Sequence, residues 1–411
     1  MSRRLKTSDR IPELDGIRVL LIFIVSWYHI WQQSWLTPFV PALELGPLTL
    51  GPAYLDFLVR AGYAPVDGTI LLSAFLLFLP YARAMNGQGP IPDRRDFYRR
   101  RAARILPSYF FWIVLIFLTV ALPWGLYDRP QQMVKDLFAH FTLTFTFWRD
   151  TYLYTPLGAA FWTLAIEAQA YLLLSFLAVR AMKHPLRVTG LMALCAFLFR
   201  AWCIWSLDDF AMVVNQLPNF LDVYALGMLL AMVWVRLADQ AKREASPAKA
   251  RSVLTRICAT LLFALGVFFF VKMMRLQAYS PDQAAIQRNQ MMYRPLFALC
   301  YAAMILPAGF MLKPFRFLLG NRLMRALSAI SMNYYLIHQT LAVHLKRLGI
   351  PPSVSQTPHM DREQPWQTQY TLLCFFLALA LATLVTLLIE KPLGRKLLRY
   401  LRGKDQERDE A

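Results

Sequence analysis

The sequence predicts an all-α, polytopic membrane protein: a bundle of about ten transmembrane helices. Apolar residues make up 57% of the 411 positions and charged residues only 17%, a composition typical of membrane proteins. The apolar residues form runs of about 18 residues or more, long enough to cross a hydrocarbon core of ~30 Å. Positive charges gather in alternate connecting segments, as they do in cytoplasmic loops. Together these observations exclude an ordinary soluble domain.

Ten apolar runs are expected to be spans. They lie near residues 17–35, 53–80, 105–122, 157–179, 188–206, 213–235, 253–272, 294–312, 326–345 and 370–390. In this scheme residues 1–16 are a cytoplasmic N-terminus, residues 17–390 the membrane domain and residues 391–411 a cytoplasmic tail. The first span is expected to persist as a transmembrane helix, because Arg18 and His29 interrupt the region that a cleavable signal peptide keeps apolar.

The formal net charge of +19 is explained mainly by topology. Most of the 44 Lys and Arg residues lie in the N-terminus, in every second loop and in the tail. This asymmetry predicts an even number of spans with both termini cytoplasmic, so the charge does not indicate a nucleic-acid partner. Residues 131–150 contain Lys135, Asp136, His140 and Arg149. Counting them as a span would break the alternation, so we expect a re-entrant or interfacial segment on the outer side.

Ionisable side chains inside the spans are the first candidates for function, because they are costly in a membrane and usually line a site. Arg18 and His29 are eleven positions apart, so they share one helix face about 16 Å apart. Asp67, Glu167 and His338 fall near the middle of other spans. The two histidines approach from the cytoplasmic side and the two carboxylates from the outer side. All four reach a similar depth, which predicts a buried proton-handling site.

Structural roles for the same residues stay open at this point. A histidine in mid-span can simply make a hydrogen bond between helices, and His338 beside a pair of tyrosines could do so. Asp67, next to a glycine, could cap a broken helix. The five cysteines all fall in predicted spans without CxxC spacing, so we expect packing residues and no metal site; they are Cys195, Cys203, Cys258, Cys300 and Cys374.

Several short motifs, in order along nearly the whole chain, resemble those of the membrane acyltransferase-3 family. They are Leu14 to Arg18 followed by His29, Asp67-Gly68 with Ser73-Ala74-Phe75, the arginine-rich segment 97–109, the segment 161–171, and the closing stretches 335–338 and 389–392. Two positions depart from the family pattern. Ala74 stands where glycine is usual, and Ala168 stands where a second acidic residue commonly follows Glu167.

The resemblance implies transfer of an acyl group, often acetyl, from cytoplasmic acyl-CoA to a hydroxyl of a glycan, a lipid-linked sugar or another acceptor. Acyl-CoA would be a donor substrate, with no tightly bound cofactor. Arg101 and Arg104 match the family's Arg-x-x-Arg motif, and guanidinium forks suit the phosphates of CoA. We expect Arg18, Arg101 and Arg104 to contact the donor. The candidate substrate contacts in the polar interior are Asp67, Ser73, Trp162 and His338.

Transfer to a hydroxyl requires a base, because an alcohol attacks a thioester slowly unless its proton is taken in the transition state. His29 is the candidate, and Glu167 or Asp15 could orient its ring. A covalent acyl-histidine relay is also open. A transporter or flippase of acylated glycans or lipids, and a scaffold without activity, are the alternatives. Because no hydrolase-like extension follows the tenth span, we expect a standalone enzyme of a bacterial cytoplasmic membrane that acts on cell-envelope polysaccharides or related acceptors.

Overall fold

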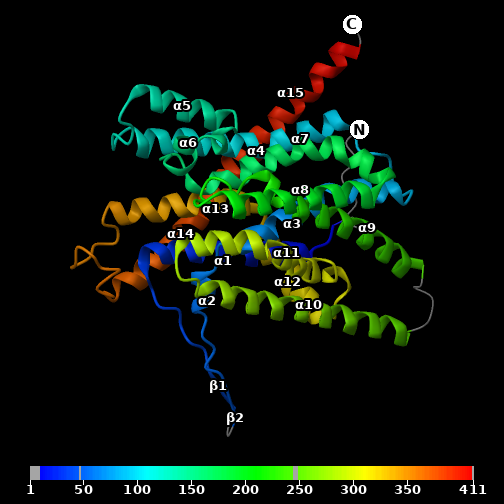
Figure 1. Ribbon diagram of the computed structural model, residues 1–411, viewed down its shortest axis with the longest axis horizontal. Helices are drawn as coiled ribbons and strands as arrows, with labels where there is room; N and C mark the ends of the chain where they lie inside the picture. The colour runs from blue at the N-terminus through cyan, green and yellow to red at the C-terminus, as the bar shows by residue number, and fades with distance from the viewer. Residues whose placement is uncertain (1–9, 46–47, 244–248, 410–411) are drawn as a thin grey trace.

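The expectation of a helical membrane protein is confirmed by the computed structural model, which describes residues 10–45, 48–243 and 249–409. Long helices run side by side in a bundle, and a single two-stranded ribbon projects from it (Figure 1). Within these described ranges, nine helical segments are long and apolar enough to cross a membrane. The chain is therefore a multi-pass membrane protein.

Ten long helices each overlap one of the ten expected spans. They are α1 (Glu13–Ser34), α3 (Pro65–Met85), α4 (Arg94–Ile116), α7 (Trp162–Lys183), α8 (Pro185–Ser206), α9 (Leu221–Arg243), α10 (Lys249–Ala278), α11 (Gln283–Ile305), α13 (Arg322–Arg347) and α14 (Trp366–Val385). Helix α13 is the one that falls outside the nine apolar segments. It has 26 residues but is more polar, and its last turn is basic.

Short elements connect these helices. They are α2 (Asp56–Arg60), α5 (Pro130–Phe141), α6 (Arg149–Leu153), α12 (Lys313–Gly320), the 3₁₀ turns η3 (Phe145–Phe147), η4 (Ala159–Phe161), η5 (Leu217–Phe220) and η6 (Ala308–Phe310), and the π-helical turns η2 (Phe117–Ala121) and η7 (Thr386–Glu390). Strands β1 (Leu43–Leu45) and β2 (Leu48–Leu50) pair antiparallel. Helix α15 (Lys391–Asp409) continues from α14 through η7.

Several helices begin at positions that differ from those expected, and two of them, α3 and α11, bear on the polar interior. Helix α3 starts at Pro65 rather than near 53, because proline is favoured in the first helical turn, and α2 forms separately before it. Helix α11 starts at Gln283 rather than near 294. The Asp282 side chain caps it by accepting a 2.7 Å hydrogen bond from the Ala285 N–H. The earlier start places Arg294 in the middle of α11 instead of at the edge of a span.

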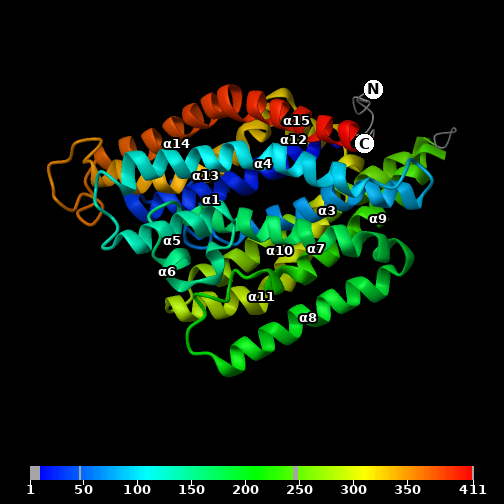
Figure 2. The same cartoon turned by 90° about the horizontal axis from the view of Figure 1, so that it is seen from above.

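The segment 131–150 forms α5, η3 and α6, which lie beside the bundle and not among its long helices (Figures 1 and 2). Lys135 on α5 pairs with Asp150 on α6 at 2.6 Å. The Tyr127 hydroxyl donates to Asp136 at 2.7 Å and, together with burial, this contact raises the pKa of Tyr127. Polar contacts of this kind fit a segment outside the apolar interior.

Helix α1 occupies the centre of the bundle. It packs against α13, α3, α12 and α14. Seen from above, α14, α13 and α4 lie on one side of α1, and α8 and α11 lie on the other (Figure 2). Helix α3 packs most extensively against α9, and this contact explains the departure at Ala74. A Cβ built on Gly227 of α9 would come within 2.6 Å of the Ala74 methyl group, so the small residue needed for close helix packing is supplied by α9.

Candidate active site

The two histidines singled out in the sequence meet between α1 and α13. Nδ1 of His29 lies 2.8 Å from Nε2 of His338, and the ring centroids are 5.0 Å apart. His338 is fully buried, whereas His29 keeps partial exposure. Helix α1 is fastened to α13 beside the pair by a 2.7 Å hydrogen bond between the hydroxyls of Ser26 and Tyr334.

The hydrogen bonds of His338 determine which nitrogen of His29 is available. Nδ1 of His338 lies 2.7 Å from the carbonyl oxygen of Tyr335, and a carbonyl oxygen can only accept, so this nitrogen carries the proton. In the neutral ring, Nε2 of His338 is then an acceptor. It accepts the hydrogen bond from Nδ1–H of His29, which leaves the lone pair on Nε2 of His29. That lone pair is what a general base or a nucleophile requires.

The carboxylates expected to orient His29 are engaged elsewhere. Asp15 accepts a 2.7 Å hydrogen bond from Arg10 and a 2.9 Å hydrogen bond from the Ser328 hydroxyl. Glu167 accepts a 2.7 Å hydrogen bond from the Tyr171 hydroxyl, one turn further along α7. The partner of the His29 ring is another imidazole instead. A neutral ring can fill this place because, in an apolar interior, it avoids the cost of burying a carboxylate charge.

The three arginines proposed as donor contacts gather around Glu167. Arg18 lies close enough to Arg104, Glu167 and Asp15 for their charges to act on it, and Arg101 is similarly close to Arg104 and Glu167. The guanidinium of Arg101 lies 5.7 Å from the centre of the Tyr171 ring, and its buried Nε has no hydrogen-bond partner among the described residues. In the part of the chain that is described, no salt bridge to Arg18, Arg101 or Arg104 is recorded.

Asp67 forms a separate centre rather than joining the histidines. Its Oδ2 lies 3.0 Å from Nε of Arg294 on α11, and both side chains are almost fully buried. The Arg294 guanidinium also donates to the Val214 carbonyl at 2.9 Å and stacks 4.0 Å from the centre of the Phe220 ring. A second buried pair, Arg200 with Asp222 at 2.6 Å, lies within electrostatic range of the first.

Neither Ser73 nor Trp162 makes a hydrogen bond or ring contact with the histidine pair in the described part of the chain. Ser73 is half-buried on α3, and Trp162 stacks on Phe220 with ring centroids 6.1 Å apart. The structure thus joins His29 to His338 and groups the three arginines with Glu167. No hydrogen bond, ion pair or ring contact within the described residues links Asp67, Ser73 or Trp162 to either group.

Two residues of the interior network were missed from the sequence. The sequence predicts Arg294 at the boundary of a span, where a charged side chain can reach water, and so gives no sign that this residue is buried. Asn333 accepts a 3.0 Å hydrogen bond from the Trp112 indole and donates to Glu390 at 2.7 Å. It thereby connects α13, just before the stretch 335–338, to the stretch 389–392. A polar side chain in an expected span, five residues before His338, is the feature by which the sequence alone could have indicated it.

Comparison with known proteins shows the family of the chain. The sequence profile of an acyltransferase domain, acyltransferase 3, matches residues 11–391. The chain belongs to this acyltransferase family. It is also 26% identical over 281 residues to YrhL of Bacillus subtilis (strain 168), a candidate peptidoglycan O-acetyltransferase. That match covers 63% of this chain and 39% of the length of YrhL. No solved structure matches the chain.

Proposed function

We propose that the protein is a membrane O-acyltransferase that moves an acyl group, in the simplest case acetyl, from acyl-CoA to a hydroxyl of a glycan. The observation that carries the proposal is the pair of hydrogen bonds running from the Tyr335 carbonyl through His338 to His29. It leaves a partly exposed imidazole nitrogen with a free lone pair inside a membrane protein. Because the chain belongs to an acyltransferase family, acyl transfer is the reaction in which this nitrogen would act.

The chemistry follows from that lone pair. Nε2 of His29 takes the proton of the acceptor hydroxyl as its oxygen attacks the thioester carbonyl. The carbon–sulfur bond breaks, and the departing thiolate takes the proton back from the imidazolium. In a relay, Nε2 attacks the thioester carbonyl, the carbon–sulfur bond breaks and CoA leaves as its thiolate. The acceptor hydroxyl then attacks the acyl-imidazole, the carbon–nitrogen bond breaks, and the hydroxyl proton passes to the freed Nε2 and on to the thiolate. Both routes need the same tautomer, and His338 holds it by accepting from Nδ1–H.

The arginines fit the donor. CoA carries a pyrophosphate and a ribose phosphate, which require cations, and Arg18, Arg101 and Arg104 lack carboxylate salt bridges among the described residues. The helical rise between Arg18 and His29 is about 16 Å. An extended pantetheine arm, with phosphate at one end and thioester at the other, suits a separation of this kind. Arg101 also has an unpartnered buried nitrogen to offer.

For the acceptor, the name given to YrhL points to the glycan of the cell envelope. We propose a cell-envelope polysaccharide or its lipid-linked precursor as the acceptor, in a bacterial cytoplasmic membrane. The Tyr28 ring lies 4.9 Å from that of His29, and the Tyr335 ring lies 5.5 Å from that of His338. Phenol hydroxyls of this kind can donate or accept hydrogen bonds with sugar hydroxyls.

Purified protein in detergent tests the proposal, because a micelle has no compartments. An acyltransferase releases CoA from acyl-CoA and passes the acyl label to an acceptor under these conditions, and the release disappears when His29 is replaced. A transporter or flippase shows no chemistry there. Release that is unchanged in His29→Ala, or no release with any acyl-CoA and acceptor glycan, would overturn the proposal.

A further inference from the structure

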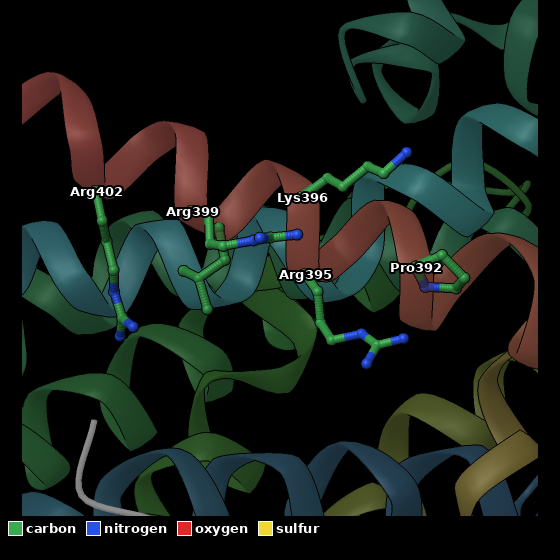
Figure 3. Close-up of a pocket in the computed structure, with 6 residues that line it drawn as sticks. Pro392, Arg395, Lys396, Arg399 and Arg402 are labelled. Atoms are coloured by element: carbon green, nitrogen blue, oxygen red, sulfur yellow. The ribbon is translucent and has the colours of Figure 1, made fainter. Parts of the chain in front are cut away.

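A basic groove runs along α15, just beyond the last membrane-spanning helix. It is an open hollow of about 560 Å³ lined by Pro392, Arg395, Lys396, Leu398, Arg399 and Arg402. In Figure 3 the side chains of Arg395 and Arg402 leave the helix on the same side. The donor site described above uses none of these residues. From this groove we infer a binding site for the phosphate-bearing headgroups of anionic lipids in the adjoining membrane leaflet.

The position of the groove in the chain favours a lipid. Helices α14 and α15 are continuous, and the apolar part ends where Lys391 begins the basic part. At 1.5 Å per residue, residues 391–402 rise about 17 Å. The headgroup layer is roughly 5–7 Å deep on each side of the hydrocarbon core. The first turns of α15 therefore stand at headgroup level.

The charge of the groove is largely uncompensated. Of its four cations, Arg402 is paired with Asp96 at 2.8 Å, and Nε of Arg395 donates to the backbone carbonyl of Lys391 at 3.1 Å. For Lys396 and Arg399, no ion pair with any described residue is recorded. Clusters of Lys and Arg directly beyond a transmembrane helix attract anionic lipids. The arginine forks add bidentate contacts to phosphate oxygens.

The groove is also held in a fixed position. A Cβ built on Gly394 would clash with the carbonyl oxygen of Ala103 on α4, so α15 lies directly against that helix. The Arg402–Asp96 pair fastens the next turns of α15 to the start of α4. Topology alone would require positive charge somewhere in the tail, but it would not require four cations along one groove of an anchored helix.

The apolar lining suits a lipid better than a free nucleotide. Leu398 and the methylene stems of the basic side chains face the groove, while their charged ends can reach outward. A phospholipid presents both kinds of group, an anionic phosphate and, beyond the glycerol, apolar acyl chains. A nucleotide phosphate shares only the first of these.

The test measures lipid association with the full-length protein in nanodiscs. Spin-labelled phosphatidylglycerol reports the fraction of lipid held by the protein, against a background of phosphatidylcholine. The test variant is Arg395→Gln/Lys396→Gln/Arg399→Gln. The matched control removes three exposed charges at the same end of the bundle, in Arg180→Gln/Lys183→Gln/Arg187→Gln.

Each cation near an anionic surface strengthens binding about fivefold, which is about 1 kcal/mol. The test variant should therefore lose selectivity for phosphatidylglycerol by roughly 100-fold, and the control should keep most of it. If the triple variant does not fold, Arg399→Gln alone should show about a fivefold loss. Equal association in test and control variants, or no preference of the wild type for phosphatidylglycerol, would overturn the inference.

A second arm separates the sources of phosphate. Adenosine 3′,5′-bisphosphate is titrated into detergent-solubilised protein without added lipid. A lipid site predicts the same nucleotide affinity in the wild type and the test variant. Nucleotide binding that is lost in the test variant would assign the groove to the donor and refute the lipid site. Neither arm depends on acyl transfer, so failure here leaves the proposed reaction untouched.

Discussion

The His29–His338 pair and the Asp67–Arg294 pair are both ionisable pairs buried in the middle of the bundle, yet they are suited to different tasks. The histidines are held by neutral hydrogen bonds that end in a free lone pair on a partly exposed ring. Asp67 and Arg294 neutralise each other, and both side chains are almost fully buried. The comparison teaches that depth in the membrane identifies costly residues, whereas the partial exposure of one member distinguishes a pair suited to reaction from a structural one.

The largest expected effect is on the reaction, at the exposed member of the histidine pair. His29→Ala should lower the turnover of acyl-CoA by roughly 10²–10⁴-fold, because a general base or nucleophile is lost. The thermal unfolding temperature should stay close to that of the wild type. Both are measured on purified protein in detergent. Activity above about a tenth of the wild-type level in folded His29→Ala would remove His29 from the chemistry.

The charged pair should show the reverse behaviour. Arg294→Leu leaves Asp67 buried without a partner and should lower the free energy of unfolding by about 3–5 kcal/mol. The double variant Asp67→Leu/Arg294→Leu should recover much of that loss, since no buried charge remains. Denaturant unfolding in detergent measures both, with turnover per folded molecule as the second readout. If Arg294→Leu were as stable as the wild type but inactive, Arg294 would belong to the reaction and the contrast between the pairs would fail.

The arginine cluster around Glu167, where we expect the donor to bind, adds a third site to the comparison. Arg101→Ala should raise the KM for acyl-CoA by roughly 10- to 150-fold, because a charge-assisted contact of about 1.5–3 kcal/mol is lost. A truncated donor without the nucleotide should be affected much less. Arg101→Lys should recover only part of the loss, since a point charge does not reproduce the guanidinium fork.

Arg100→Ala is the matched control for Arg101. Arg100 is exposed on the same helix and already paired with Asp96 at 2.7 Å, so its loss removes the same charge from outside the cluster around Glu167. We expect the KM of Arg100→Ala for acyl-CoA to stay near the wild-type value. Equal effects of Arg101→Ala on full-length and truncated donors would make Arg101 a structural residue.

The smallest effect is expected at the buried histidine, which acts by positioning its partner. His338→Leu should lower kcat roughly 2- to 13-fold, as expected for the loss of one hydrogen bond of roughly 0.5–1.5 kcal/mol. His338→Gln should restore part of it, because the amide oxygen can accept from Nδ1–H of His29. A purely packing role would leave leucine and glutamine equally active once both are folded, so the ratio of their kcat values decides the matter.

The sequence by itself determined the class of the protein and singled out most of the residues that we propose for its chemistry. Long apolar runs can form only helices in a bilayer, since each backbone N–H must be satisfied within its own segment. That argument predicted the helices without any knowledge of their contacts. The resemblance of motifs such as Leu14 to Arg18 followed by His29 identified the family that the match over residues 11–391 confirms. His29 and His338 could be singled out because ionisable residues in spans are rare.

Only the tertiary structure decided which of these residues meet. Helical periodicity gives the depth and face of a residue on its own helix, but helix rotation and neighbour order depend on packing between segments far apart in the chain. His29 and His338 are 309 positions apart and in contact, whereas Asp67, predicted at the same depth, is held by Arg294 on α11. The sequence did not indicate Arg294 as that partner, because the apolar run begins near residue 294. The helix itself begins eleven residues earlier, at Gln283, where Asp282 caps it. Partner choice is a property of the packed bundle, and no single segment of the sequence encodes it.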